Sequence, residues 1–170
     1  MSPRKRAQRT LELLDLGCQT PYPWQQEDGK TPLSPNSTRQ TSALVSITPS
    51  IREWDYGDYE GITSSEIRAQ RAAQGLSANW DIWRDGCPSG ESPADIVERL
   101  DKLIAEIRRD WHEPVMGKGE GEGEVEEGRN HDVLIVAHGH ILRALAMRWI
   151  GKDLESTAFL LEAGGVGTLR

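Results

Sequence analysis

The segment from residue 132 to residue 150, DVLIVAHGHILRALAMRWI, limits the possible folds of this chain more than any other stretch. Five consecutive apolar residues, Val133–Ala137, are followed by His-Gly-His, and apolar residues with helical spacing then start at Ile141. An unbroken apolar run is typical of a strand that is buried on both faces of a parallel sheet. The segment therefore predicts a buried parallel strand whose carboxyl end leads directly into a helix.

Other segments extend this alternation of strands and helices. Residues 43–51 (ALVSITPSI) predict a second strand, and the final GVGTLR predicts the start of another. Three sites have the N-cap chemistry that begins helices: Ser2-Pro3, Thr63 with Glu66, and Ser92-Pro93. The helix after Ser92 is expected to end at Pro114 and to carry one apolar stripe, formed by Ile96, Leu100, Leu103, Ile104, Ile107 and Trp111. This alternation indicates an α/β layered domain.

Length and charge restrict the class of protein. A chain of 170 residues suits one domain, and a net charge of -7 argues against general binding of nucleic acid or of an anionic membrane. No apolar run approaches the roughly 20 residues that span a bilayer. The two cysteines, Cys18 and Cys87, form no metal-binding pattern and favour the reducing cytoplasm, while the basic start at residues 4–6 leaves a nuclear location open. Residues 117–128 (GKGEGEGEVEEG) predict an acidic, glycine-rich surface insertion.

The histidines at the expected junction of strand and helix are candidates for a functional site. Ligands of open parallel sheets bind beyond the carboxyl ends of strands, and the free N–H groups of a helix N-terminus favour an anion. His138, Gly139 and His140 occupy such a junction, so a phosphate group suits this place. A histidine that only caps the turn is an alternative. A metal site is another, but no acidic or cysteine partner has ligand spacing nearby.

Basic residues at the start of the first expected helix are a second candidate feature. Arg4, Lys5 and Arg6 crowd its first turn, where positive charge is unfavourable by roughly a few tenths of a kcal/mol per residue. A bound phosphate would make these charges favourable, with an arginine fork on its oxygens. An exposed and solvated helix end explains the same pattern.

A third candidate lies in the segment REWDYGDYEG, residues 52–61. Glu53 follows a predicted strand and is flanked by Arg52 and Trp54. An aromatic neighbour can desolvate a carboxyl group and thereby favour its protonated form, which is the form of a general acid. Four acidic residues in ten could also be simply solvated. Together, an arginine, a carboxylic acid and a histidine at a helix start suit phosphoryl transfer, and we expect Arg6, Glu53 and His138 to converge on one pocket.

Four motifs in this chain, SPRKRAQRT, REWDYGDYEG, GES and IVAHGH, resemble in order those of the phosphoglycerate mutase-like histidine phosphatases. The residues of these motifs are most similar to those of the fungal sedoheptulose-1,7-bisphosphatase branch of that family. The resemblance implies a three-layer α/β fold in which helices flank a mostly parallel central sheet.

The resemblance also implies roles for matching residues. Arg6 would bind the transferred phosphoryl group, Glu53 would give a proton to the leaving alcohol, and His138 would stabilise the phosphoryl oxygens. Substrate contacts are expected from the residues at the remaining motif positions: Ser2, Tyr56, Gly139 and His140. No metal or organic cofactor is expected, because arginine and histidine supply the positive charge that a cation provides elsewhere.

The nucleophile of this family is the histidine of an Arg-His-Gly motif upstream of the Ser-Pro motif, and no position here matches it. His112 and His131 lack the context of a nucleophile. The sequence therefore predicts a single domain, residues 1–170, that lacks its first strand at one end, is short at the other, and is inactive as it stands. The full-length form is expected to hydrolyse a small sugar bisphosphate resembling sedoheptulose or fructose bisphosphate. Phosphoglycerate mutase activity and a non-catalytic phosphate-binding protein are the alternatives.

Overall fold

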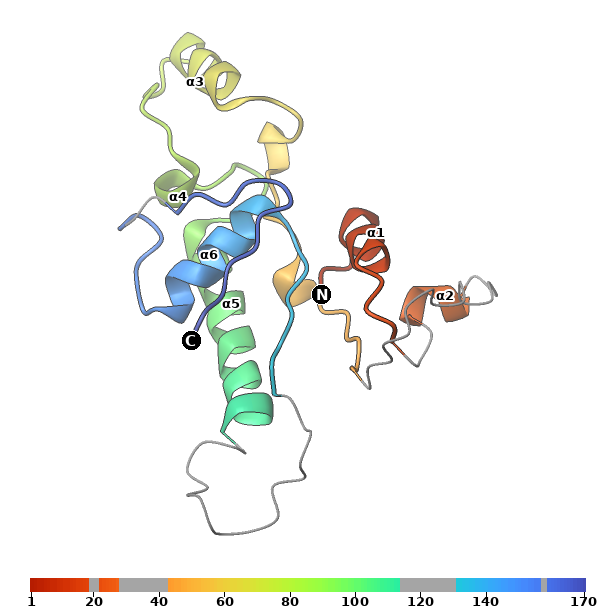
Figure 1. The fold of residues 1–170 in the computed structure, drawn as a ribbon. Helices are drawn as coiled ribbons and strands as arrows, with labels where there is room; N and C mark the ends of the chain where they lie inside the picture. Colours follow the sequence, from red (N-terminus) through yellow and green to blue (C-terminus); the bar gives the residue numbers. More distant parts are fainter. Residues whose placement is uncertain (19–21, 28–42, 114–130, 157–158) are drawn as a thin grey trace. The chain divides into compact units, whose positions relative to one another are not determined.

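The computed structural model describes residues 1–18, 22–27, 43–113, 131–156 and 159–170 (Figure 1). The chain divides into two compact units. Unit 1 comprises Met1–Arg52 and Leu134–His138, and unit 2 comprises Glu53–Val133 and Gly139–Arg170. That the 170 residues form one domain stays a prediction, and the acidic insertion expected at 117–128 lies outside the described residues.

Unit 1 is built around one amphipathic helix. It contains α1 (Lys5–Leu13), α2 (Pro23–Glu27) and the 3-10 turn η1 (Pro49–Ile51). Ala7 and Leu11, one helical turn apart, are buried and form a small core with Val136. The partly buried side chains that pack against this core are Met1, Leu16, Tyr22, Trp24 and Val45.

Helix α1 begins later than the Ser2-Pro3 signal predicts, so that predicted helix start is wrong. Its N-cap is Arg4, which makes no capping hydrogen bond through its side chain. The Ser2 side chain is fully buried and its hydroxyl pairs with His138. A serine hydroxyl with a long-range partner is a poor cap for a nearby helix.

Three extended segments of unit 1 are joined by backbone hydrogen bonds. Met1 N donates to Ser46 O over 2.6 Å, and Thr48 N donates to Met1 O over 3.0 Å. On its other side, Ser2 N donates to Val136 O over 3.0 Å. The segments 46–48, 1–2 and 136 therefore neighbour one another, although none of the described residues forms a regular strand.

The expected strand at Val133–Ala137 is not buried on both faces. Val136 is buried against Ala7 and Leu11. By contrast, Val133, three residues away and so on the opposite face of an extended chain, is 38% exposed, and Leu134 is 57% exposed. An apolar run becomes a doubly buried strand only when neighbouring elements cover both of its faces. The predicted double burial is therefore wrong for the described residues, and the central sheet stays a prediction.

The two other predicted strands are also absent from the described residues. Residues 43–48 form no regular strand, and 49–51 form η1, where the Thr48 side chain accepts a hydrogen bond from Ser50 N. Residues 165–170 are irregular, and Val166 is 89% exposed.

Unit 2 contains most of the helices. They are the 3-10 turn η2 (Gly57–Tyr59), α3 (Ser64–Ala73), α4 (Ile82–Asp85), α5 (Pro93–Ile107), the π-helical turn η3 (Arg108–His112) and α6 (Gly139–Trp149). Both predicted starts of helices in this unit are confirmed. Thr63 with Glu66 forms a capping box on α3, and Ser92 with Asp95 forms one on α5.

Helices α5 and α6 pack side by side (Figure 1). The apolar stripe of α5 is confirmed from Ile96 to Ile107, and it is buried along its length. Trp111 lies in the π-helical turn and is 42% exposed, because the wider turn rotates later residues away from the stripe. Across the pair, the Arg148 guanidinium binds both carboxylate oxygens of Asp101, at 2.8 and 2.9 Å.

None of the helices in the described part of the chain combines the length and the apolar character that crossing a bilayer requires.

Candidate functional site

The predicted site residues are divided between the two units. Ser2, Arg6 and His138 belong to unit 1. Glu53, Tyr56, Gly139 and His140 belong to unit 2. The convergence of Arg6, Glu53 and His138 stays a prediction.

In unit 1, Ser2 and His138 form a direct contact. Ser2 Oγ lies 2.9 Å from His138 Nε2, and the Ser2 side chain is fully buried. The backbone pairing of Ser2 with Val136 explains this contact, since it aligns the residue two positions before His138 with the serine. Ser2 Oγ also accepts a longer hydrogen bond, 3.4 Å, from Arg4 N. The hydroxyl thus orients the imidazole through Nε2.

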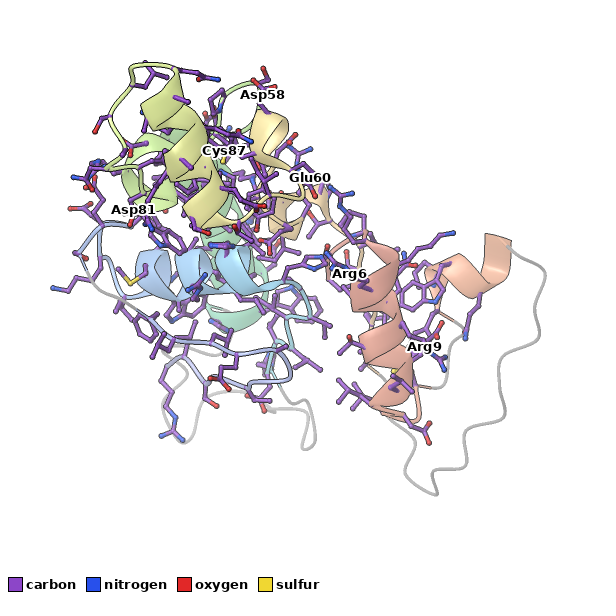
Figure 2. All side chains as sticks on the ribbon, turned by 90° about the horizontal axis from the view of Figure 1, so that it is seen from above. Arg6, Arg9, Asp58, Glu60, Asp81 and Cys87 are labelled. Carbon is purple, nitrogen blue, oxygen red and sulfur yellow. The ribbon has the colours of Figure 1, made fainter. Side chains whose placement is uncertain are left out.

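Arg6 lies in the first turn of α1 and its side chain is exposed. Figure 2 labels it on α1 together with Arg9. The first turn contains no acidic residue, so the positive charge of Arg6 adds to the positive end of the helix dipole. Arg9, by contrast, pairs with Glu12 at 2.8 Å. The start of α1 is therefore an electropositive surface that an anion would stabilise.

In unit 2, the Glu53 carboxylate occupies the N-terminus of α6. Glu53 Oε1 accepts hydrogen bonds from Ile141 N at 2.9 Å and from Trp54 N at 3.0 Å. Glu53 Oε2 accepts a longer one from His140 N at 3.3 Å. We predicted that free N–H groups of this helix would receive a phosphate. Two of these donors hold the Glu53 carboxylate here, and phosphate binding at this helix start stays a prediction.

Tyr56 and His140 form the second contact at the start of α6. Tyr56 Oη lies 2.8 Å from His140 Nδ1, and the two rings meet edge to face. Burial, followed by the negative charges of Glu53 and Glu60, raises the pKa of the Tyr56 hydroxyl well above its usual value. Burial and then the positive charge of Arg143 lower the pKa of His140 below 6.5. Both groups are therefore neutral at pH 7, and the tyrosine O–H can donate to an unprotonated Nδ1.

Two residues that sequence reasoning missed surround His140. The Trp83 ring lies 5.5 Å from the His140 ring, and the Arg143 guanidinium lies over Trp83 at 5.2 Å. Arg143 Nε also donates to Gly139 O over 3.2 Å. The spacing of Arg143 from His140, three residues along a helix, was an available signal that the two side chains share a face. Trp83 belongs to the segment IWRDGC, but no spacing signal indicated that it meets His140.

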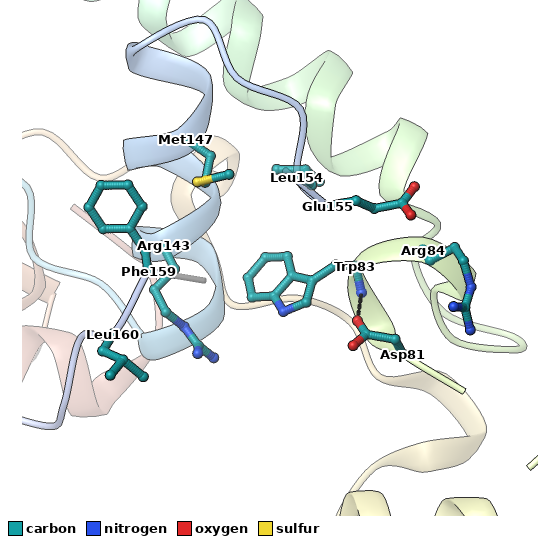
Figure 3. Close-up of a pocket in the computed structure, with 9 residues that line it drawn as sticks. All are labelled: Asp81, Trp83, Arg84, Arg143, Met147, Leu154, Glu155, Phe159 and Leu160. Carbon is teal, nitrogen blue, oxygen red and sulfur yellow. Dashed lines mark hydrogen bonds between the residues drawn. The ribbon is translucent and has the colours of Figure 1, made fainter. Parts of the chain in front are cut away.

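Trp83 and Arg143 also line a pocket of about 400 Å³ (Figure 3). It is lined by Asp81, Trp83, Arg84, Arg143, Met147, Leu154, Glu155, Phe159 and Leu160. None of the predicted site residues lines it. In Figure 3, Asp81 accepts the hydrogen bond that the Trp83 backbone donates, at 2.9 Å.

Comparison with known proteins connects these features to one family. Residues 35–116 match the histidine phosphatase superfamily (branch 1). The chain is 34% identical to sedoheptulose 1,7-bisphosphatase of Saccharomyces cerevisiae over 164 residues. The aligned residues are 95% of this chain and 50% of that protein. This chain belongs to the histidine phosphatase superfamily. The predicted membership is confirmed, and with it the prediction of a phosphoric monoester hydrolase family.

Two further proteins are similar to this chain. An acid phosphatase of Mycobacterium tuberculosis is 33% identical over 122 residues, which are 71% of this chain and 49% of that protein. A solved structure of an open reading frame product from Mycobacterium tuberculosis superposes with a TM-score of 0.53 at 29% identity, covering 90% of this chain and 54% of the other. This likeness supports the phosphoglycerate mutase-like fold. The chain spans about half the length of the curated relatives that it matches.

Proposed function

We propose that this chain supplies the phosphoryl-binding and proton-donating groups of a histidine phosphatase that acts on a small sugar bisphosphate. The substrate class resembles sedoheptulose or fructose bisphosphate, as the yeast relative's name suggests. The observation that carries the proposal is the Glu53 carboxylate, held by backbone N–H groups at the start of α6, the helix that directly follows His138 in the chain.

Glu53 has the properties of the proton donor in this reaction. When the bond between phosphorus and the ester oxygen breaks, the leaving alkoxide takes a proton from the Glu53 carboxyl group. The resulting carboxylate is then received by the N–H groups of Ile141 and Trp54.

Arg6 and His138 have the properties of phosphoryl-binding groups. The exposed guanidinium of Arg6 at a helix start can bind phosphate oxygens through two parallel hydrogen bonds. The imidazole of His138, oriented by Ser2, can donate to a phosphoryl oxygen as negative charge develops in the transition state. These roles need no metal or organic cofactor.

In our proposal, none of the four histidines of this sequence is the nucleophile that attacks phosphorus. None stands in an Arg-His-Gly motif. His138 contacts Ser2, and His140 contacts Tyr56. The ring of His112 meets Trp149 edge to face. This observation favours a second candidate for the 170 residues taken alone, a phosphate-binding protein without turnover.

Phosphate release tests the proposal. The chain alone is compared with an extended chain, in which a segment with the family's Arg-His-Gly motif is joined ahead of residue 1. We expect the extended chain to release phosphate from sedoheptulose 1,7-bisphosphate or fructose 1,6-bisphosphate, and the chain alone to release none. Isothermal titration should show inorganic phosphate bound by both, and by neither after Arg6→Ala.

Three results would count against this function. They are turnover by the chain alone, rearrangement of phosphoglycerate by the extended chain without phosphate release, and the absence of phosphate binding in both folded chains. Circular dichroism establishes that each sample is folded.

A further inference from the structure

Glu91 and Arg99 form an ion pair in unit 2 to which no role has been given. Arg99 Nε donates to Glu91 Oε1 at 2.8 Å, and Arg99 Nη2 donates to Glu91 Oε2 at 3.0 Å. Only 11% of the Glu91 side chain and 15% of the Arg99 side chain are exposed. Glu91 belongs to the GES motif and Arg99 to α5. A bidentate pair that is shielded from water has one well-defined geometry and is costly to break.

Glu91 binds the short segment between Glu53 and Tyr56 in three ways. Glu91 Oε2 accepts a hydrogen bond from Asp55 N, and Glu91 N donates to Asp55 O, both at 2.9 Å. Glu91 O accepts a hydrogen bond from the indole of Trp54, also at 2.9 Å. Trp54 itself is only 1% exposed. Both residues that separate Glu53 from Tyr56 are therefore attached to Glu91.

Two glycines allow this attachment. Gly57 has φ +50°, and a Cβ at this position would overlap Pro88 O and Gly90 N. A Cβ at Gly90 would overlap Asp55 O. The backbones of the two loops are thus in direct contact, and Asp58 N donates to Pro88 O at 2.9 Å. Asp58 of the one loop and Cys87, which precedes Pro88 in the other, are labelled in Figure 2.

We propose that Glu91, fixed by Arg99, is a positioning residue for Glu53 and Tyr56. A displacement of Trp54 and Asp55 would move Glu53 relative to the N–H groups of α6 on one side. On the other side it would move Tyr56 relative to His140. The inference rests on the proposed function only in that it makes Glu53 the proton donor. Its geometry is independent of that role.

The decisive experiment uses the 170-residue chain and does not require activity. Because the Ile141 amide donates to the Glu53 carboxylate, its proton chemical shift reports the ionisation of Glu53 in a pH titration by NMR. We expect Glu91→Gln, which removes the charge at nearly constant volume, to reduce this pH-dependent shift at least about twofold. Glu98→Gln is the matched control, because Glu98 lies next to Arg99 on α5 and its pair with Lys102 is exposed. It should leave the Ile141 titration unchanged.

Arg99→Lys is a second, milder variant that still tests the proposal if Glu91→Gln does not fold. It keeps the positive charge but removes the fork, so we expect a smaller reduction of the Ile141 shift than with Glu91→Gln. An Ile141 titration that matches the unsubstituted chain in both folded variants would overturn the proposal. An equal reduction with Glu98→Gln would overturn it as well.

Kinetics with the extended chain separate positioning from general stability. A nitrophenolate leaving group needs no proton, whereas a sugar alkoxide does. We expect Glu91→Gln to lower kcat for the sugar bisphosphate by about tenfold or more, with little change for p-nitrophenyl phosphate. Equal losses on both substrates would contradict a positioning role. If the unsubstituted extended chain hydrolyses neither substrate, the proposed function fails, and the NMR titration still decides the role of Glu91.

Discussion

Glu53 Oε1 lies 2.9 Å from Ile141 N, so a side chain that precedes the buried Trp54 caps the helix that follows His138. The N-cap function is usually carried out by a residue directly before the helix. Here a distant carboxylate satisfies two of the donors that α6 leaves without an intrahelical partner. Glu53, the candidate general acid of the site, therefore also stabilises unit 2 through this contact.

Removing the Glu53 charge should therefore affect both properties. Glu53→Gln keeps one carbonyl acceptor but loses the favourable interaction with the helix dipole, so we expect the free energy of unfolding to fall by about 1 kcal/mol. Urea denaturation measures it. In the extended chain, kcat for the sugar bisphosphate should fall by roughly 10²- to 10⁴-fold. Glu60→Gln, an exposed residue of the same segment, is the control. Unchanged kcat in Glu53→Gln would exclude Glu53 as proton donor.

The lowered pKa of His140 predicts a dependence of stability on pH. Its folded pKa lies below the ordinary value of 6.5, so the unfolded chain binds more protons in the interval between the two values. The contribution is fully present above pH 6.5 and is lost as the pH falls through the folded pKa. Urea denaturation between pH 7.5 and pH 5 should show this decline, and His140→Asn should reduce it. His131→Asn should not. A decline of equal size in His140→Asn would mean that another group causes it.

The Ser2 hydroxyl should control the orientation of His138. Ser2→Ala removes a fully buried hydrogen bond and should lower the free energy of unfolding by about 1 kcal/mol. Without this partner at Nε2, the affinity for inorganic phosphate measured by titration calorimetry should also fall. Ser64→Ala, at an exposed position at the start of α3, should change neither quantity. If phosphate affinity survives Ser2→Ala intact, Ser2 does not orient a phosphate-binding imidazole.

The contact between the two loops of unit 2 should make Gly57 intolerant of a side chain. Gly57→Ala combines a positive φ with overlap against the backbone of Pro88 and Gly90, so the free energy of unfolding should fall by more than about 2 kcal/mol. Gly61→Ala is a matched control. Gly61 also has a positive φ, +78°, but a Cβ there would meet nothing within 4 Å. It should cost only about 1–2 kcal/mol. A similar loss of unfolding free energy at both positions would contradict this prediction. It would show that the positive φ alone makes the substitution unfavourable, without a contribution from the close approach of the two loops.

Local signals in the sequence predicted the elements that residues close in sequence can build. The capping box at Thr63 and the N-cap at Ser92 formed as predicted, because each side chain reaches an N–H group within the same helical turn. The α5 stripe formed for the same reason, since its members share a face by spacing alone. It failed at Trp111, where the turn widened. The four ordered motifs, among them those with Glu53 and His138, also predicted the family.

The tertiary structure decided everything that depends on distant partners. Ser2 is a residue type that caps helices, but its hydroxyl pairs with His138, and the apolar segment 133–137 is fully buried only at Val136. The carboxylate of Glu53 fills the helix terminus that the sequence offered to a phosphate. Hydrophobic burial and long-range hydrogen bonds depend on which segments meet after folding, and spacing along the chain carries no information on that. Sequence therefore determined the chemical groups and the local helices, and the packing of the chain determined which groups bind one another.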